Sequence, residues 1–433
     1  MSPVIELGEL RRPEDDDEPL PAPPRRPPGR VARAVALGCL LLLTLAGAAA
    51  PARPPAPVRV PAAPGALFVV LAGRLMVADG PSALHQGGRV VTGYRLTAGA
   101  PAWRFALPAG DHVLGLTGAV GGLLVSSSPT GVGDARATLL DPATGAVRWQ
   151  QAGYPVPTAS GGVLFENPRP GGTGRVLAVD PTSGATRWSL AVPPQGVAYR
   201  RDDRGVTQLL LIEPDGRVAV HDADSGARVR AGRVSSAPDG VAYRFAQVVA
   251  GLLLVEGASG EITAYGVDRL DRRWSVPVDP RAGSWFTDCA GMVCLRDQVG
   301  DAQALDPATG RPAWTDERWA GFGPVGDRLI AAEAGDGPEL ELSVLEPATG
   351  RVLGRLGRWR VSGRDDGSGR LLGLLGLRHL AGDRTLVGEL DVPAGEARPR
   401  AVLPGSWAEC ADAGVALVCL RPAGGLAVWP ARR

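Results

Sequence analysis

Four histidines and five cysteines are the side chains of this sequence best suited to metal or nucleophilic chemistry. No two histidines have the i, i+4 spacing that places a pair of metal ligands on one face of a helix. We therefore interpret them as isolated surface or core residues, and they are His85, His112, His221 and His379. All 46 basic residues are arginine, which excludes Schiff-base chemistry and a phosphate-binding Walker lysine.

Three other groups of residues lack the context that their chemistry requires. Ser126–Ser128 have no Gly-x-Ser-x-Gly surroundings, and the glycine pairs at 121–122, 161–162, 171–172 and 424–425 do not form a phosphate-binding loop. We predict that these residues lie in loops. Residues 364–369 are acidic and rich in glycine, but they lack the spaced ligands of a calcium loop and are interpreted as a solvated turn.

Four of the cysteines form two local pairs in matching surroundings. Gly-Ser-Trp precedes the first member of each pair, and Leu-Arg follows the second; the pairs are Cys289 with Cys294 and Cys410 with Cys419. They predict two short disulfides across neighbouring strands in an oxidising compartment. A zinc site is the alternative, and it would require four ligands to converge from distant parts of the sequence.

Composition indicates which elements must position these residues. The 433 residues include 60 Gly and 40 Pro, more turn residues than helical bundles tolerate, and 45% are hydrophobic. An all-β body with many turns is therefore expected. The 46 basic and 45 acidic residues leave a net charge of +1, so we predict no nucleic-acid partner.

The N-terminal region differs from the rest of the sequence. Residues 1–33 are polar and proline-rich, which predicts a disordered tail, and 34–50 form an uncharged apolar run that is just long enough to span a bilayer. The arginine excess before this run predicts a transmembrane signal anchor with a cytoplasmic N-terminus. A cleaved signal peptide is the alternative. Residues 51–65 contain six prolines and are expected to be an extended linker.

A turn phrase of the form Asp-Pro-Ala-Thr-Gly recurs through the remaining sequence. The clearest copies are Asp141–Gly145 before Trp149, Asp180–Gly184 before Trp188, and Asp306–Gly310 before Trp314. Weaker copies include Gly99 before Trp103 and Leu270 before Trp274, whereas Gly226, Gly350 and Gly395 precede no tryptophan. The mean spacing is about 42 residues, which is typical of four-stranded propeller blades.

The phrase has the chemistry of a β-hairpin. Its proline sets the first corner of a turn, its aspartate can accept backbone N–H groups, and its glycine can take the left-handed conformation before the next strand. One sheet of about 42 residues cannot bury both of its faces, so neighbouring sheets must stack and close into a ring. Because the tryptophans repeat after the same turn, we expect them to pack between blades rather than to stack on sugars.

These repeats resemble the pyrroloquinoline-quinone-like (PQQ-like) repeat, whose β-propellers most often have eight blades. The chain is also similar to membrane-anchored propellers that actinobacteria export. The resemblance implies a propeller over 66–433, and we favour eight four-stranded blades, with seven as the alternative. Strands near 415–419 and 426–429 are expected to complete a blade with an N-terminal strand near Leu67–Leu71, which would close the ring.

The resemblance also implies what to expect of function. Quinone-dependent dehydrogenases of this family carry an adjacent Cys-Cys pair and a calcium site, and no residue here matches either, so no cofactor, metal or catalytic residue is expected. We predict a membrane-tethered scaffold that binds a protein, a cell-envelope component or a small ligand on one propeller face. The alternatives are a quinone-dependent dehydrogenase and a sensor that signals through its tail, where residues 4–10 could dock a cytoplasmic partner.

Overall fold

The structure is a computed structural model. It describes residue 29 and residues 56–430, except 79–89, 97, 120, 130–134, 168–173, 195, 235–244, 258–259, 278–284, 297–301, 364–367 and 378–381. The chain divides into two compact units, Met1–Pro54 and Pro55–Arg433, and the second unit contains all the strands considered below. The predicted membrane segment 34–50 and almost all of the predicted tail lie outside the described residues. Where the chain is described, none of its helices has the length and apolar character that a bilayer crossing requires.

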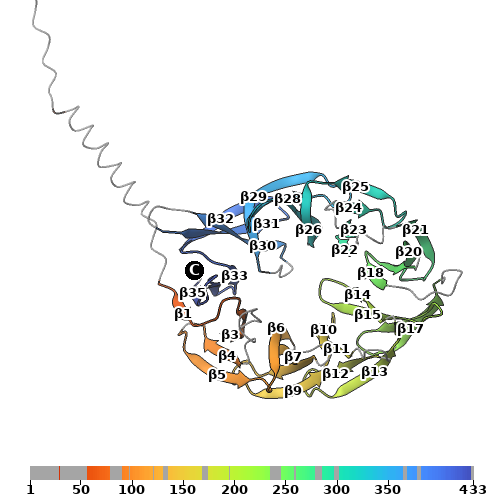
Figure 1. The fold of residues 1–433 in the computed structure, drawn as a ribbon, viewed down its shortest axis with the longest axis horizontal. Helices are drawn as coiled ribbons and strands as arrows, with labels where there is room; N and C mark the ends of the chain where they lie inside the picture. Colours follow the sequence, from red (N-terminus) through yellow and green to blue (C-terminus); the bar gives the residue numbers. More distant parts are fainter. Residues whose placement is uncertain are drawn as a thin grey trace, which may run out of the picture. The chain divides into compact units, whose positions relative to one another are not determined.

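Antiparallel strands in consecutive groups of four build most of the second unit, and the groups follow one another around a ring in Figure 1. Six four-stranded sheets have this simple order. They are β2 (Leu67–Leu71), β3 (Arg74–Ala78), β4 (Val90–Arg95) and β5 (Pro101–Ala106); β6 (Asp111–Ala119), β7 (Gly122–Pro129), β8 (Arg136–Leu140) and β9 (Val147–Ala152); β10 (Tyr154–Pro157), β11 (Val163–Asn167), β12 (Gly174–Val179) and β13 (Thr186–Val192); β14 (Val197–Arg201), β15 (Val206–Ile212), β16 (Arg217–Asp222) and β17 (Arg228–Arg233); β18 (Phe245–Val249), β19 (Leu252–Glu256), β20 (Glu261–Gly266) and β21 (Arg272–Pro277); β22 (Trp285–Cys289), β23 (Met292–Arg296), β24 (Ala302–Leu305) and β25 (Pro312–Asp316).

A seven-stranded sheet joins two four-stranded groups through one long strand. Its strands are β26 (Trp319–Val325), β27 (Arg328–Glu333), β28 (Leu340–Leu345), β29 (Val352–Ser362), β30 (Arg370–Leu377), β31 (Arg384–Asp391) and β32 (Glu396–Pro404). The first part of β29, Val352–Trp359, pairs with β28. Its last residues, Arg360–Ser362, pair with β30. The strand therefore ends one group and begins the next without an intervening loop.

The last sheet combines strands from both ends of the unit. It contains β33 (Glu409–Asp412), β34 (Ala416–Leu420), β35 (Leu426–Pro430) and, at its edge, β1 (Val58–Val60). In the antiparallel register Arg59 lies opposite Ala427. The residues that follow β1 also contact this sheet, because the Gly425 amide donates a hydrogen bond to the Ala62 carbonyl at 2.8 Å.

The closing sheet confirms that strands from the two ends pair, but it corrects the strand that was expected. Leu67–Leu71 forms β2, the first strand of the next sheet, and Val58–Val60 supplies the missing edge strand. The position follows from connectivity, because the strand that completes the closing sheet must precede the first strand of the sheet that follows it. The region predicted as a linker up to residue 65 therefore contributes a strand to the propeller.

The hydrophobic core lies between neighbouring sheets rather than at one centre. Middle strands are covered on both faces and carry continuous apolar runs, such as Leu209–Ile212 in β15. Outer strands alternate, so that in β5 Trp103 is buried among exposed neighbours. One cluster joins Leu210 of β15 to Leu253 and Val255 of β19. Such packing of sheet on sheet around a ring is the architecture of a β-propeller.

Candidate functional site

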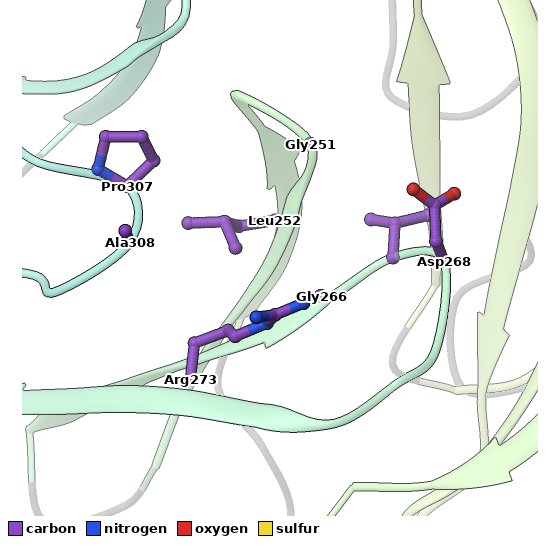
Figure 2. A pocket seen from close by; sticks show the side chains of 8 residues that line it. Gly251, Leu252, Gly266, Asp268, Arg273, Pro307 and Ala308 are labelled. Atoms are coloured by element: carbon purple, nitrogen blue, oxygen red, sulfur yellow. The ribbon is translucent and has the colours of Figure 1, made fainter.

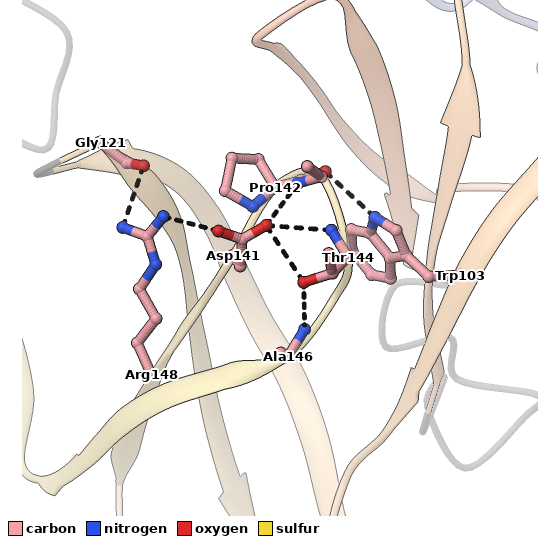
Figure 3. Close-up of polar contacts among 8 residues, drawn as sticks. Trp103, Gly121, Asp141, Pro142, Thr144, Ala146 and Arg148 are labelled. Atoms are coloured by element: carbon pink, nitrogen blue, oxygen red, sulfur yellow. Dashed lines mark hydrogen bonds and ion pairs between the residues drawn. The ribbon is translucent and has the colours of Figure 1, made fainter.

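The turn between β8 and β9 shows what the repeated phrase does (Figure 3). The Asp141 carboxylate accepts hydrogen bonds from the amides of Ala143 and Thr144, at 2.9 and 3.0 Å, and from the Thr144 hydroxyl at 3.1 Å. Arg148 donates to the same carboxylate at 2.7 Å and to the Gly121 carbonyl at 3.3 Å. Arg148 and the turn's N–H groups hold the pKa of Asp141 at about 2. The arginine thus links the two turns at this end of the sheet.

Equivalent acidic residues cap other turns in the same way. Asp180 accepts from the Ser183 amide at 2.8 Å, Asp222 from the Ser225 amide at 2.8 Å, and Asp306 from the Ala308 amide at 2.7 Å. The turn amide and hydroxyl of Ser183 lower the pKa of Asp180. The hydroxyl of Thr349, followed by Arg351, lowers the pKa of Glu346. These carboxylates are therefore engaged by their own turns.

Each repeated tryptophan contacts the turn of the next sheet. Its indole N–H donates to a backbone carbonyl there, with distances of 2.7–3.0 Å. The pairs are Trp103 with Pro142, Trp149 with Pro181, Trp188 with Asp224, Trp274 with Pro307 and Trp314 with Pro347. The indoles are buried or half-buried, as expected for packing between blades.

The turn glycines lie directly under these indoles. A Cβ added to Gly145 would lie 2.6 Å from Trp103, and one added to Gly310 would lie 2.5 Å from Trp274. Gly184, Gly226 and Gly350 have the same contact with Trp149, Trp188 and Trp314, at 2.6–2.8 Å. Their φ angles of +67° to +73° are also left-handed. Gly99 lies instead against Val58 of β1, and a Cβ added to Gly99 would lie 2.4 Å from the Val58 side chain.

At two other contacts between adjacent sheets, different residues replace the tryptophan or the glycine. Between β17 and the β20–β21 turn, Arg230 replaces the tryptophan and donates to the Val267 carbonyl at 3.3 Å, and Leu270 occupies the glycine position at φ +56°. Between β29 and the β31–β32 turn, Gly354 replaces the tryptophan and approaches Gly395. The buried Trp359, which the repeat pattern did not identify, packs instead against Gly373 of β30 and Gly388 of β31.

Both predicted disulfides are confirmed. Cys289 and Cys294 join β22 to β23, and Cys410 and Cys419 join β33 to β34, with Cα atoms 5.8 and 4.1 Å apart. All four cysteines are buried. Each disulfide links an edge strand of its sheet to the strand beside it, as the matching sequence surroundings indicated. Cys410 also exchanges hydrogen bonds with the Ser362 hydroxyl of β29, which connects it to the neighbouring sheet.

The predicted loop at Ser126–Ser128 is wrong, because these residues belong to β7. Ser127 is buried and donates to Asp111 at 3.0 Å, while Arg136 pairs with the same carboxylate at 3.0 Å. Asp111 is 1% exposed, and its two partners compensate for the burial of its charge. The sequence signal for this cluster was weak, since its members come from three strands.

The remaining candidates for chemistry are not brought together. His112 and His221 lie in different sheets, and His85 and His379 lie outside the described residues. Residues 364–367 of the predicted acidic turn also lie outside the described residues. Within the described ranges, no group of three or more His, Cys, Asp or Glu side chains could hold a metal ion.

Ring-stacked sheets, repeated capped turns and interlocking tryptophans define a β-propeller of PQQ-like repeats. The chain belongs to the PQQ_2 family, described as outer membrane protein assembly factor BamB, whose model matches residues 86–316 and 215–357. No curated protein matches the chain.

Three solved structures are among those similar to the chain. BamB from Moraxella catarrhalis is 18% identical, with a TM-score of 0.42, covering 86% of this chain and 100% of that one. The computationally designed Ika8 protein is 10% identical, with a TM-score of 0.40 and the same coverages. Quinohemoprotein alcohol dehydrogenase from Comamonas testosteroni is 13% identical, with a TM-score of 0.39, covering 87% of this chain and 76% of that one. At these identities and scores, none of the three assigns an activity to the chain.

Proposed function

We propose that this protein is a non-catalytic, membrane-tethered propeller that acts outside the cytoplasm as a binding scaffold. Its partner is a protein or a component of the cell envelope that docks on one propeller face. Membership of a family described as an assembly factor supports this role.

One observation carries the proposal: the repeated turn carboxylates and tryptophan side chains make the contacts that hold the ring together. The turn carboxylates accept hydrogen bonds from their own turns, and the tryptophan N–H groups donate to the next turn. Repetition of these residues is therefore explained by assembly of the propeller. The remaining surface, formed by the loops and turns at the two ends of the strands, is left for binding.

We further propose nine blades rather than eight. Dividing the seven-stranded sheet at β29 gives two four-stranded blades, which join the seven four-stranded sheets. The nine hydrophobic clusters of the described residues support this division, because each spans one pair of adjacent blades. The cluster that contains Val60 and Val428 lies between the closing sheet and the sheet formed by β2–β5.

The location that we propose rests on the sequence and on the disulfides. The apolar run at 34–50 would hold the protein in the cytoplasmic membrane as a single-pass anchor, with the N-terminus inside and the propeller outside. Buried disulfides in two sheets support an oxidising environment for the propeller. A membrane-impermeant protease added to intact cells should cleave the propeller but leave the tail protected.

Site-specific photo-crosslinking in cell membranes tests the scaffold role. Asp327 and Asp336 are exposed and lie at opposite ends of β27, so a photoreactive residue at each samples one propeller face. We expect one position to give a discrete adduct and the other to give none. Adducts at neither position would contradict docking on a face.

An activity assay tests the non-catalytic part of the proposal. Full-length protein is supplied with pyrroloquinoline quinone and calcium and assayed for dye-linked oxidation of alcohols and sugars. We expect no turnover above protein-free controls. Turnover would instead favour the quinone-dependent dehydrogenase.

A further inference from the structure

The turn between β4 and β5 has an arginine at the position where most of the equivalent turns have an acid. The Gly99 amide donates to the Arg95 carbonyl at 2.8 Å, as the Gly145 amide does to the Asp141 carbonyl, also at 2.8 Å. Arg95 therefore occupies the position of Asp141, and the charge there is reversed. The other acids at this position are Asp180, Asp222, Asp306, Glu346 and Asp391.

A second arginine lies directly opposite the first. In the antiparallel register of β3 and β4, Arg74 is the partner of Arg95. The same two positions in β30 and β31 hold Arg370 and Asp391, which form an ion pair at 3.6 Å. Like charges directly opposite one another destabilise a sheet, whereas opposite charges stabilise it. The Arg74–Arg95 pair therefore lacks the counter-charge that Asp391 gives Arg370.

No described acidic side chain supplies this counter-charge. The described residues between 56 and 110 include no Asp or Glu and four arginines, which are Arg59, Arg74, Arg95 and Arg104. Within the part of the chain that the structure describes, no ion pair joins any of these four side chains to another residue. Asp141, in the turn of the next sheet, is bound by Arg148 at 2.7 Å and by its own turn. The sheet of β2–β5 is thus positively charged in its described residues.

The β20–β21 turn also lacks the acid, but its arginine has a partner. Gly266 stands at the position of the acid, and Arg273 extends toward it beside a cavity of about 230 Å³ (Figure 2). Asp271 pairs with Arg273 at 3.2 Å. The charge of Arg273 is therefore compensated within its own turn, unlike the charges of Arg74 and Arg95.

The chain enters the propeller beside the Arg74–Arg95 pair. Val58, the first residue of β1, packs against the β4–β5 turn, where a Cβ added to Gly99 would lie 2.4 Å from the Val58 side chain. β1 begins eight residues after the apolar run at 34–50 ends. Even when fully extended, eight residues span at most ~30 Å. An anchor in that run would therefore hold this turn close to the phosphate groups of the membrane surface.

We propose that Arg74 and Arg95 bind the phosphate group of an anionic phospholipid in the membrane that holds the anchor. The inference rests on the proposed membrane tether and names the lipid chemistry that the propeller recognises. A guanidinium binds phosphate oxygens through two parallel N–H groups, so two guanidiniums on adjacent strands can share one phosphate. The phosphate takes the place that the Asp391 carboxylate has opposite Arg370. Arg59 and Arg104 are exposed and add attraction to an anionic surface.

Lipid photo-crosslinking of the full-length protein in nanodiscs tests this site. A photoreactive residue replaces Ala98, which is exposed in the β4–β5 turn, and the discs contain phosphatidylcholine with or without phosphatidylglycerol. We expect a phosphatidylglycerol adduct that Arg74→Gln or Arg95→Gln reduces about fivefold. Arg370→Gln, at the position equivalent to Arg74 but with an acid opposite, should leave the adduct unchanged.

Arg95→Asp separates loss of the site from loss of the fold. This variant recreates the pairing of Arg370 with Asp391, so we expect it to abolish the adduct without lowering the thermal midpoint. A phosphatidylglycerol adduct that survives Arg95→Asp would overturn the site.

Other results would also overturn it. One is the absence of a phosphatidylglycerol adduct from the unchanged pair. Suppression of the adduct by inorganic phosphate, but not by chloride at equal ionic strength, would assign the pair to free phosphate. A protein adduct in cell membranes, in place of the lipid adduct, would assign it to an acidic partner. Protein that does not insert into the discs would contradict the tether itself, whereas inserted protein without a lipid adduct would contradict this site alone.

Discussion

Two contacts between adjacent sheets have different residues at the same pair of positions. One position is in the last strand of a sheet, and the other is in a turn of the next sheet. At the first, Trp103 of β5 lies over Gly145, whose φ is +73°. At the second, Arg230 of β17 stands in place of the tryptophan, and Leu270 holds the turn position at φ +56°. The left-handed turn survives the loss of glycine. The comparison teaches that the approaching indole, more than the backbone conformation, requires glycine in these turns.

At the contact between β17 and the β20–β21 turn, the residues of the strand and of the turn have complementary sizes. A leucine at position 270 fills space beside Gly232, whose added Cβ would lie 2.7 Å from Leu270 Cδ1. Leu270 is itself buried in the core shared with β15 and β19. Leu270 of the turn therefore packs against Gly232 of the strand, two residues beyond Arg230.

The largest expected effect is the loss of an indole from a regular contact. Trp149→Ala removes packing against Gly184 and Phe165 and a hydrogen bond to Pro181, and should cost about 3–5 kcal/mol of stability. Arg230→Ala, at the exceptional contact, should cost less than about 1 kcal/mol. Chemical denaturation of both full-length variants measures the difference, and equal losses would refute the distinction.

A substitution in the turn glycine should have the next largest effect. Gly310→Ala places a Cβ 2.5 Å from Trp274 at φ +69°, and we expect a loss of about 2–4 kcal/mol. Combining Trp274→Arg with Gly310→Leu recreates the residues found at 230 and 270. Denaturation of the double variant and both single variants should reveal a favourable coupling above about 1 kcal/mol. Strict additivity would mean that the indole does not determine the turn residue.

The disulfides test how far the contacts between sheets depend on covalent links within a sheet. The chain-entropy account gives about 2–3 kcal/mol for loops as short as these. Cys289→Ser with Cys294→Ser should lower the free energy of unfolding by about this amount alone. Cys410→Ser with Cys419→Ser should also disturb the bonds between Ser362 and Cys410 that join two sheets. Greater hydrogen exchange confined to β29 and β33 in the second variant would support this, and identical exchange in both variants would contradict it.

Acid should have the smallest effect on stability, and it should act through the turns that an acidic residue caps. The pKa of Asp141 falls from 3.8 to about 2 on folding, so its ionised form stabilises the fold above pH ~4. That contribution is lost as the pH falls from about 4 to 2. The site is at the surface, so Asp141→Asn should cost less than about 1 kcal/mol at pH 7 and only a small part of that at pH 2. A stability difference independent of pH would exclude the carboxylate as its source.

The sequence predicted the parts of this fold that recur. The turn phrase has local chemistry, since Asp141 and Gly145 act within five residues, and its repetition required stacked sheets. The disulfides were predictable because each joins adjacent strands in matching surroundings. The contact of Gly145 with Trp103 was not predicted, because it joins residues of different sheets. Asp111 and its partners were missed for the same reason.

Ring closure was predicted in kind but placed on the wrong strand. Leu67–Leu71 has the stronger apolar pattern, whereas Val58–Val60 is a three-residue strand within a proline-rich region. Propensity favoured the former, and the order of strands around the ring required the latter. The cavity lined by Leu252, Arg273 and Pro307 was also not predictable from local sequence, because three turns of two adjacent sheets form it.

Strand β1 and strand β35 give the ring a single seam held by hydrogen bonds. β1 is the first strand of the unit to be synthesised and β35 is the last. The seam therefore cannot form until the whole unit has been synthesised, because Val58 and Val60 of β1 pack in a cluster that includes Val428 of β35. Closure of the ring therefore depends on every strand between them, and a chain that stops before β35 would leave β1 without its pairing strand.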